Sequence, residues 1–146
     1  MSTGSVVVRP LGQQSTDDAY CGQRDTVTTD APRILVVEDD PNIRGLYATL
    51  FQDDGYSVAM AVDGQDGLDQ LACNPDLIIL DLLMPFMDGR QFLRRLRGLA
   101  GHRRTPVLVV TAGTDGTTVD GAQAVMQKPF DTEALLRRVS ELLRLN

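Results

Sequence analysis

The sequence contains few of the residues on which several classes of functional site depend. Among its 146 residues there are two cysteines, Cys21 and Cys73, and they form no CxxC pair. A framework of several disulfides and a CxxC metal or redox motif are therefore excluded. The one histidine, His102, lies in a Gly/Arg-rich connector without partner residues at metal-ligand spacing, so no histidine-based site is expected.

Long uncharged stretches are also missing. Charged residues interrupt every hydrophobic run, and no basic start followed by an apolar block opens the chain. Neither a membrane span nor a secretory signal is predicted, and we expect a cytoplasmic location. The formal net charge of -6 argues against direct nucleic-acid binding. A local cluster of arginines between Arg94 and Arg104 is typical of a solvated helix face and loop.

The composition changes near residue 33. Residues 1–32 are rich in Ser, Thr, Gly, Gln and Asp and show no sustained periodicity, which is typical of a flexible N-terminal tail. From Arg33 to Asn146, short apolar runs alternate with helical patterns. This length suits one domain with its own core, so a single domain over residues 33–146 is predicted.

Five apolar runs in this part predict short buried strands. They are Ile34–Val37, Tyr56–Ala61, Leu77–Asp81, Val107–Val110 and Ala124–Met126. Helices are predicted between them: one from Pro41 with Asp40 as its N-cap, one after Asp63, one from about Arg90, and a last one capped by Asp131.

The first of these helices has a regular apolar pattern. Its spacing predicts one buried face made of Ile43, Leu46, Tyr47, Leu50 and Phe51. Strands that alternate with helices in this way predict an α/β fold, a flavodoxin-like doubly wound parallel sheet of five strands in the order 2-1-3-4-5.

Polar side chains follow the carboxyl ends of the predicted strands. Glu38 and Asp39 come after the first strand, Asp81 ends the third, Thr111 ends the fourth, and Lys128, the only lysine of the chain, follows the fifth. The first and third strands are neighbours in this sheet order, so the three carboxylates are expected to converge. Carboxylates that converge repel one another unless a cation intervenes, and oxygen ligands suit Mg²⁺. A carboxylate in such a site can accept a phosphoryl group.

Four segments together resemble the receiver domain of two-component response regulators. They are Ile-Leu-Val-Val-Glu-Asp-Asp-Pro, Asp-Leu-Ile-Ile-Leu-Asp-Leu-Leu-Met-Pro-Phe-Met-Asp-Gly, Val-Leu-Val-Val-Thr-Ala and Gln-Lys-Pro-Phe. Each segment alone is a weak signal, but the four occur in the family's order and each lies at the end of a predicted strand. The resemblance covers essentially residues 33–146.

The resemblance implies a role for each matching residue. Asp81 is the expected phosphoacceptor, and a sensor histidine kinase or a histidine phosphotransfer protein is expected to supply the phosphoryl group. Thr111 and Lys128 are expected to contact that group. Glu38, Asp39, Asp81 and the backbone carbonyl of Leu83 are the expected ligands of Mg²⁺. Pro129 matches a position whose preceding peptide bond is cis in the family.

The sequence departs from the family pattern in two places. The segment between Thr111 and Lys128 is about one helical turn shorter than usual, and its Gly/Thr-rich part favours a shortened or missing fourth helix. In addition, Val125 stands where the family usually has an aromatic residue, so a different relay of the signal is expected.

Three functions remain open at this level. The first is a stand-alone phosphoacceptor switch that has no output domain and is not an enzyme beyond slow loss of its own phosphate. The second is a phosphorylation-independent interaction module, favoured by Val125 and the short segment. The third, a metal-dependent phosphatase, is disfavoured because Leu83, two residues after Asp81, is no general acid.

Overall fold

A computed structural model describes residues 31–112 and 119–144 of the chain. Within them, five parallel strands form one sheet in the predicted order β2-β1-β3-β4-β5. The strands are β1 (Arg33–Val37), β2 (Ser57–Ala61), β3 (Leu77–Leu80), β4 (Val107–Thr111) and β5 (Ala124–Gln127). The prediction of a doubly wound α/β sheet is therefore confirmed.

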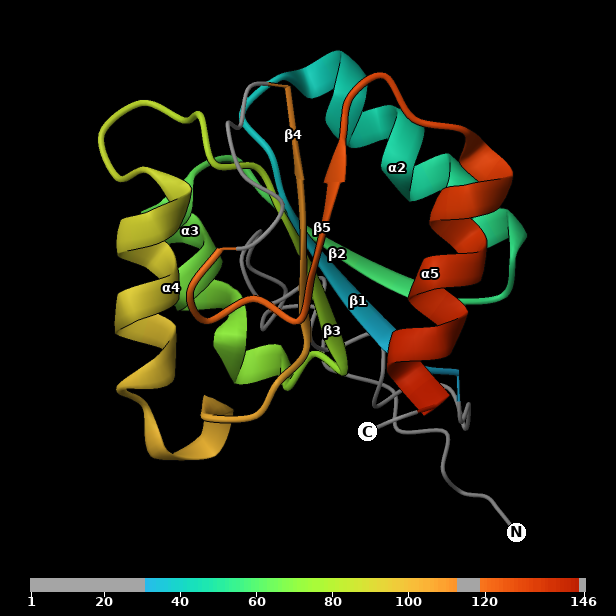
Figure 1. The fold of residues 1–146 in the computed structure, drawn as a ribbon. Coiled ribbons are helices and arrows are strands. Elements are labelled where there is room, and N and C mark those ends of the chain that lie inside the picture. Colours follow the sequence, from blue (N-terminus) through green and yellow to red (C-terminus); the bar gives the residue numbers. More distant parts are fainter. Residues whose placement is uncertain (1–30, 113–118, 145–146) are drawn as a thin grey trace, which may run out of the picture.

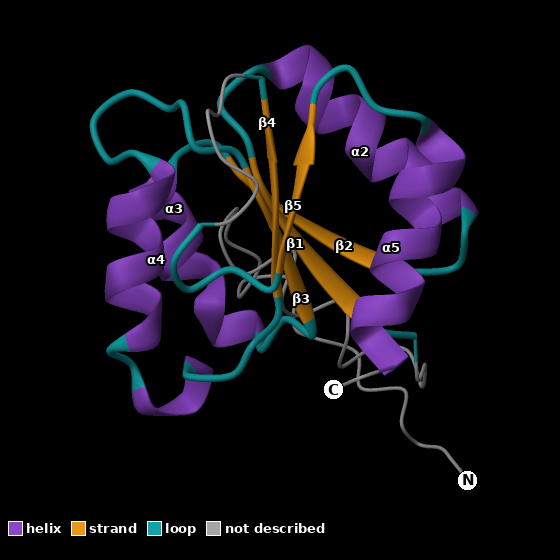
Figure 2. Ribbon diagram, viewed as in Figure 1, coloured by secondary structure: helices purple, strands orange, loops and turns teal. Residues whose placement is uncertain are grey.

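Helices cover both faces of the sheet (Figures 1 and 2). On one face lie α3 (Gly64–Asp69), which continues into the 3-10 helix η2 (Gln70–Cys73), and α4 (Gly89–Arg97). On the other face lie α2 (Pro41–Asp53) and α5 (Thr132–Arg144), and a short 3-10 helix, η3 (Ala100–His102), follows α4. No helix in the part of the chain described by the structure is long and apolar enough to cross a membrane.

The core consists of two apolar layers, one on each side of the sheet. Successive strand residues point to opposite faces, so Leu35 and Val37 pack under α3 and α4 while Ile34 and Val36 pack under α2 and α5. Every residue of β1, β3 and β4 is buried. Strands buried on both faces need continuous apolar runs, which is why these three strands could be predicted from the sequence.

Helix α2 begins as predicted. The Asp40 carboxylate accepts hydrogen bonds from the N–H groups of Asn42 (2.8 Å) and Ile43 (3.5 Å), and Pro41 occupies the first turn. The predicted buried face was wrong at one position, because Leu46 is 49% exposed. The buried stripe instead passes through Tyr47, Ala48 and Phe51, so the helix is rotated away from the side that Leu46 occupies.

The connection from β4 to β5 is described only in part. Residues 119–123 form a turn, with Gly121 at φ +91°, and contain no helix. The rest of the predicted shortened or missing fourth helix, residues 113–118, lies outside the described residues. So do residues 1–30, and with them nearly all of the predicted tail.

The loop between β3 and α4 passes very close to the start of α4. The Gly89 N–H donates to the Leu82 carbonyl (3.0 Å), and a Cβ added at Gly89 would lie 2.7 Å from the Asp81 carbonyl oxygen and from the Leu82 Cα. Asp88 and Gln91 close a reciprocal cap at the helix N-terminus (2.9 and 3.0 Å). The backbone around Asp81 is thus fixed by a contact that only glycine permits.

The Gly89 contact leads to a stability prediction. Gly89→Ala should lower the free energy of unfolding by about 1–3 kcal/mol, because backbone atoms cannot move aside as a flexible side chain can. Gly45→Ala is the matched control, since Gly45 lies within α2 with no atom near its missing Cβ. That variant should be stabilised by about 0.5–1 kcal/mol. Urea unfolding measures both changes, and equal effects of the two substitutions would contradict the proposed contact.

Candidate functional site

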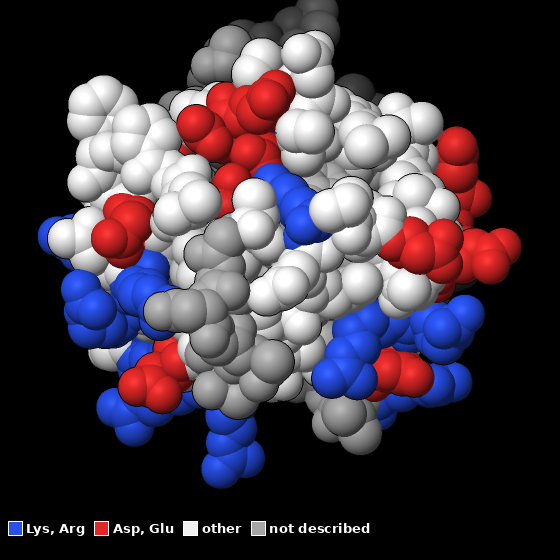
Figure 3. Space-filling view, turned by 45° about the horizontal axis from the view of Figure 1, so that its top comes forward, with Lys and Arg blue, Asp and Glu red and all other residues white. Residues whose placement is uncertain are grey.

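Three carboxylates meet at the carboxyl ends of β1 and β3. The parallel register pairs Val37 with Leu80, so the residues that follow, Glu38 and Asp81, emerge side by side. Oxygen atoms of Glu38, Asp39 and Asp81 lie within 4.8 Å of one another. Glu38 and Asp81 are buried, while Asp39 is exposed. Figure 3 shows acidic side chains gathered on this face with a basic side chain directly beside them.

Lys128 contributes the positive charge of this cluster. Its Nζ lies 3.3 Å from Glu38 Oε1 and 3.6 Å from Asp81 Oδ2, and its side chain is only 23% exposed. The residue follows β5, and the peptide bond between Lys128 and Pro129 is cis. One ammonium group is therefore shared by two buried carboxylates, as a compact and rotatable donor allows.

The cluster has more negative charge than its surroundings can balance. Burial first, and then the charge of Asp81, raise the pKa of Glu38 to about 7, while the Asp40 N–H and Lys128 act in the opposite direction. The Asp40 N–H donates to Glu38 Oε2 at 3.2 Å. A divalent cation bound by these oxygen atoms would relieve the repulsion, and carboxylates are the ligands that hard cations prefer.

Two backbone contacts hold the carboxylates in place. The Leu83 N–H donates to Asp81 Oδ1 at 3.2 Å, which keeps the Leu83 backbone beside that carboxylate. The Arg44 guanidinium donates to the carbonyls of Glu38 (2.9 Å) and Asp39 (3.2 Å), and so ties the loop after β1 to α2. Arg44 was missed from the sequence, since no local pattern shows that a helical arginine turns back to the preceding loop.

Thr111 lies at the end of β4 and is fully buried. Its carbonyl accepts a hydrogen bond from the Lys128 N–H at 3.0 Å, so the structure places its backbone next to that of the lysine. Its hydroxyl is buried and has no hydrogen-bond partner among the described residues.

Val125 occupies the centre of β5, paired with Val109. The side chain is half-buried and packs against the core under α3 and α4. Val125, the aliphatic residue that stands where the family usually has an aromatic ring, therefore points to the α3–α4 side of the sheet.

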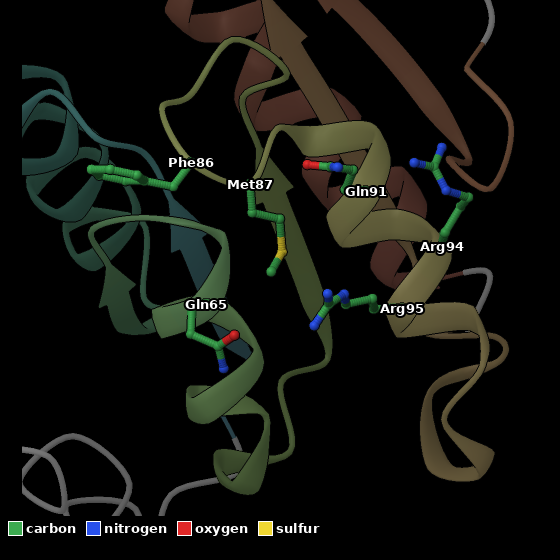
Figure 4. Close-up of a pocket in the computed structure, with 6 residues that line it drawn as sticks. All are labelled: Gln65, Phe86, Met87, Gln91, Arg94 and Arg95. Atoms are coloured by element: carbon green, nitrogen blue, oxygen red, sulfur yellow. The ribbon is translucent and has the colours of Figure 1, made fainter.

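A separate hollow of about 510 Å³ lies between α3 and α4, and none of the predicted site residues lines it. Its walls are Gln65, Phe86, Met87, Gln91, Arg94 and Arg95. Figure 4 shows the Met87 side chain directed between the two helices and the Phe86 side chain directed away from them. Phe86 is 96% exposed and has φ +69°, a backbone region that residues other than glycine rarely adopt.

Comparison with known proteins identifies one family. Residues 34–140 match the response regulator receiver domain. The chain is 38% identical over 120 residues to the response regulator ArlR of Staphylococcus aureus, a match that covers 77% of this chain and 52% of ArlR. The chain thus spans about half the length of the curated relatives it matches.

Solved structures give the same result. The fold superposes on the chemotaxis response regulator CheY4 of Vibrio cholerae with a TM-score of 0.72 and 31% identity, covering 77% of this chain and 98% of CheY4. It also superposes on the receiver domain of the Francisella response regulator 1452 with a TM-score of 0.69 and 32% identity, covering 77% and 97% of the two chains.

The raised pKa of Glu38 predicts a pH dependence of stability. Its folded value of about 7 exceeds the ordinary 4.5, so the folded state binds the proton more tightly than the unfolded state. The resulting stabilisation is complete below about pH 4.5 and is lost as the pH rises through 7. Without divalent metal, the unfolding midpoint of the wild type should therefore fall over this range relative to that of Glu38→Gln.

Thermal unfolding in EDTA at several pH values measures this difference. Glu141→Gln is a suitable control, because Glu141 is an exposed glutamate of α5 paired with Arg138 at 3.1 Å. The dependence of its unfolding midpoint on pH should run parallel to that of the wild type. A Glu38→Gln profile that also runs parallel would show that Glu38 does not titrate in this way.

Proposed function

Since the chain belongs to the family of response regulator receiver domains, we propose that it is a phosphoacceptor switch whose phosphorylated residue is Asp81. The phosphodonor is a sensor histidine kinase or a histidine phosphotransfer protein, and transfer requires Mg²⁺ held by Glu38, Asp39, Asp81 and the backbone carbonyl of Leu83. Receiver domains are in general signalling switches rather than enzymes. The proposed donor implies a cytoplasmic location.

One observation carries the proposal: three carboxylates converge, and two of them, Glu38 and Asp81, pair with the only lysine of the chain. In the transfer, a carboxylate oxygen of Asp81 attacks the phosphorus atom as the bond between phosphorus and the donor imidazole nitrogen breaks. The imidazole leaves with the bonding electron pair. The bound cation supplies charge neutralisation for the transferring oxygens.

The other residues of the site act on the product. Lys128, already 3.6 Å from Asp81 Oδ2, can pair with the new phosphoryl oxygens. The Thr111 hydroxyl, which has no partner among the described residues, can donate to the same group. Asp81 Oδ1 accepts from the Leu83 N–H, so the carboxylate is held in one orientation before it reacts.

A phosphorylation-independent interaction module is the alternative function. It is favoured by Val125, because an aliphatic side chain at this position lacks the ring that family members use to report phosphorylation. The site favours the phosphoacceptor, since a module that only binds has no need of buried, mutually repelling carboxylates.

The proposal predicts covalent modification at one residue. The protein incubated with acetyl phosphate and Mg²⁺ should gain a single phosphoryl group, detected by intact-mass spectrometry. Asp81→Asn should abolish the adduct, since an amide is a much poorer nucleophile, and EDTA should abolish it because the repulsion between the carboxylates is no longer relieved.

Asp76→Asn is the control, because Asp76 immediately precedes β3, at the end opposite to Asp81, and accepts a hydrogen bond from the Arg33 N–H (2.8 Å). That variant should still be phosphorylated. If the wild type gains no adduct while a known receiver domain does, the phosphorylation-independent alternative is favoured. Rapid release of inorganic phosphate would instead point to a phosphatase.

A further inference from the structure

Arg44 reaches back from α2 to the loop after β1, and the proposed phosphoryl transfer gives it no role. One nitrogen of its guanidinium group, Nη1, donates to the carbonyl of Glu38 at 2.9 Å and to the carbonyl of Asp39 at 3.2 Å. Its backbone N–H donates to the carbonyl of Asp40 at 2.9 Å. The carbonyls of three successive loop residues therefore accept hydrogen bonds from this one residue.

The loop that Arg44 holds carries two of the three carboxylates of the acidic cluster. Glu38 is fixed by other contacts as well, because its N–H donates to the Ala61 carbonyl (3.1 Å) and its side chain pairs with Lys128 (3.3 Å). Asp39 is exposed. In the part of the chain that the structure describes, its one hydrogen bond is the one that its carbonyl accepts from Arg44. Asp39 is thus the ligand whose position depends most on Arg44.

This contact positions Asp39 without occupying its side chain. Arg44 donates to the carbonyl, so the carboxylate oxygens of Asp39 are left for a cation. A ligand on a loop that is not fixed has to be ordered when the ion binds, and the entropy of that ordering opposes binding. A loop held in place beforehand avoids this loss.

The charge of Arg44 acts on a cation in the opposite direction. A guanidinium group stays protonated, and beside the acidic loop it repels a divalent ion. If the charge dominated, a neutral residue at this position would make the site bind the ion more tightly. If the hydrogen bonds dominate, the same change makes binding weaker. Arg44 is half-buried, and salt screens the repulsion but does not break the hydrogen bonds, so we expect the second result.

We propose that Arg44 is a positioning residue of the magnesium site: by holding the carbonyls of the loop after β1, it keeps the Asp39 carboxylate beside Glu38 and Asp81 and raises the affinity for Mg²⁺. This role rests on the proposed function, which places Mg²⁺ on these carboxylates. In it Arg44 touches neither the ion nor the phosphoryl group, so it acts on binding of the ion and leaves the transfer step unchanged once the ion is bound.

Arg44→Met keeps the apolar stem and removes both side-chain hydrogen bonds together with the charge. Calorimetric titration of the unphosphorylated variant with MgCl₂, at constant ionic strength, should give a dissociation constant about threefold to tenfold above that of the wild type, which is the net effect of one hydrogen bond. At saturating Mg²⁺, its rate of phosphorylation by acetyl phosphate should equal that of the wild type. Arg44→Lys, which keeps a charged donor, should recover part of the lost affinity.

Arg97→Met is the matched control. Arg97 also donates to loop carbonyls, to that of His102 from Nη1 (2.9 Å) and to that of Gly121 from Nε (3.0 Å). It is the last residue of α4, whereas the first residue of that helix is the one that lies against the Asp81 carbonyl. The variant changes the net charge by the same amount and loses at least as many hydrogen bonds. It should have a lower unfolding midpoint in EDTA and a wild-type dissociation constant for Mg²⁺.

The outcomes separate the role of Arg44 from the proposed function. A dissociation constant in Arg44→Met that is unchanged or lower than that of the wild type would overturn the positioning role while leaving Asp81 as the phosphoacceptor. A higher constant that Arg97→Met reproduces would show a general loss of stability and would also overturn it. A wild-type protein that binds no Mg²⁺ and gains no phosphoryl group would overturn the proposed function, and the role of Arg44 with it.

Discussion

The repulsion between Glu38 and Asp81 is the constraint on which the rest of the structure depends. Both carboxylates are buried at the end of a sheet whose central strands are wholly buried, and among the described residues only Lys128 pairs with them both. Burial first, and then the charge of Asp81, keep the pKa of Glu38 raised even though Lys128 acts in the opposite direction. A folded chain keeps such a group only where the surrounding structure compensates for it, and a site short of positive charge is prepared to bind a cation.

The repulsion is compensated by contacts that hold the backbone around the cluster in place. Arg44 ties the loop after β1 to α2, the Leu83 N–H holds one oxygen of Asp81, and Gly89 lets α4 begin within contact of the Asp81 carbonyl. The Arg44 and Gly89 contacts end on main-chain atoms, so these two do not depend on the protonation or metal state of the carboxylates. The fold therefore holds the repelling groups together without neutralising them, and the charge is left for a ligand.

The sequence predicted the sheet and the position of Asp81 because parallel strands align their carboxyl ends, so a residue's place in the chain gives its place in the site. It predicted less where contacts between residues far apart in the chain determine which side chains are buried. Leu46 fits the apolar spacing of α2 but is exposed, because the rotation of the helix depends on the whole sheet. The hydroxyls of Tyr47 and Thr111, which have no partner in the part of the chain that the structure describes, follow no local pattern, since a missing partner can be recognised only when the neighbours are known.

The residues near Lys128 differ between the two sides of the sheet. Val125, on the α3–α4 side, is an aliphatic side chain packed in that core and has no ring to swing. On the α2–α5 side, Phe130 is joined through Lys128 and Pro129 to the site and is stacked on Tyr47. A displacement of Lys128 therefore meets aromatic contact on one side of the sheet and aliphatic packing on the other.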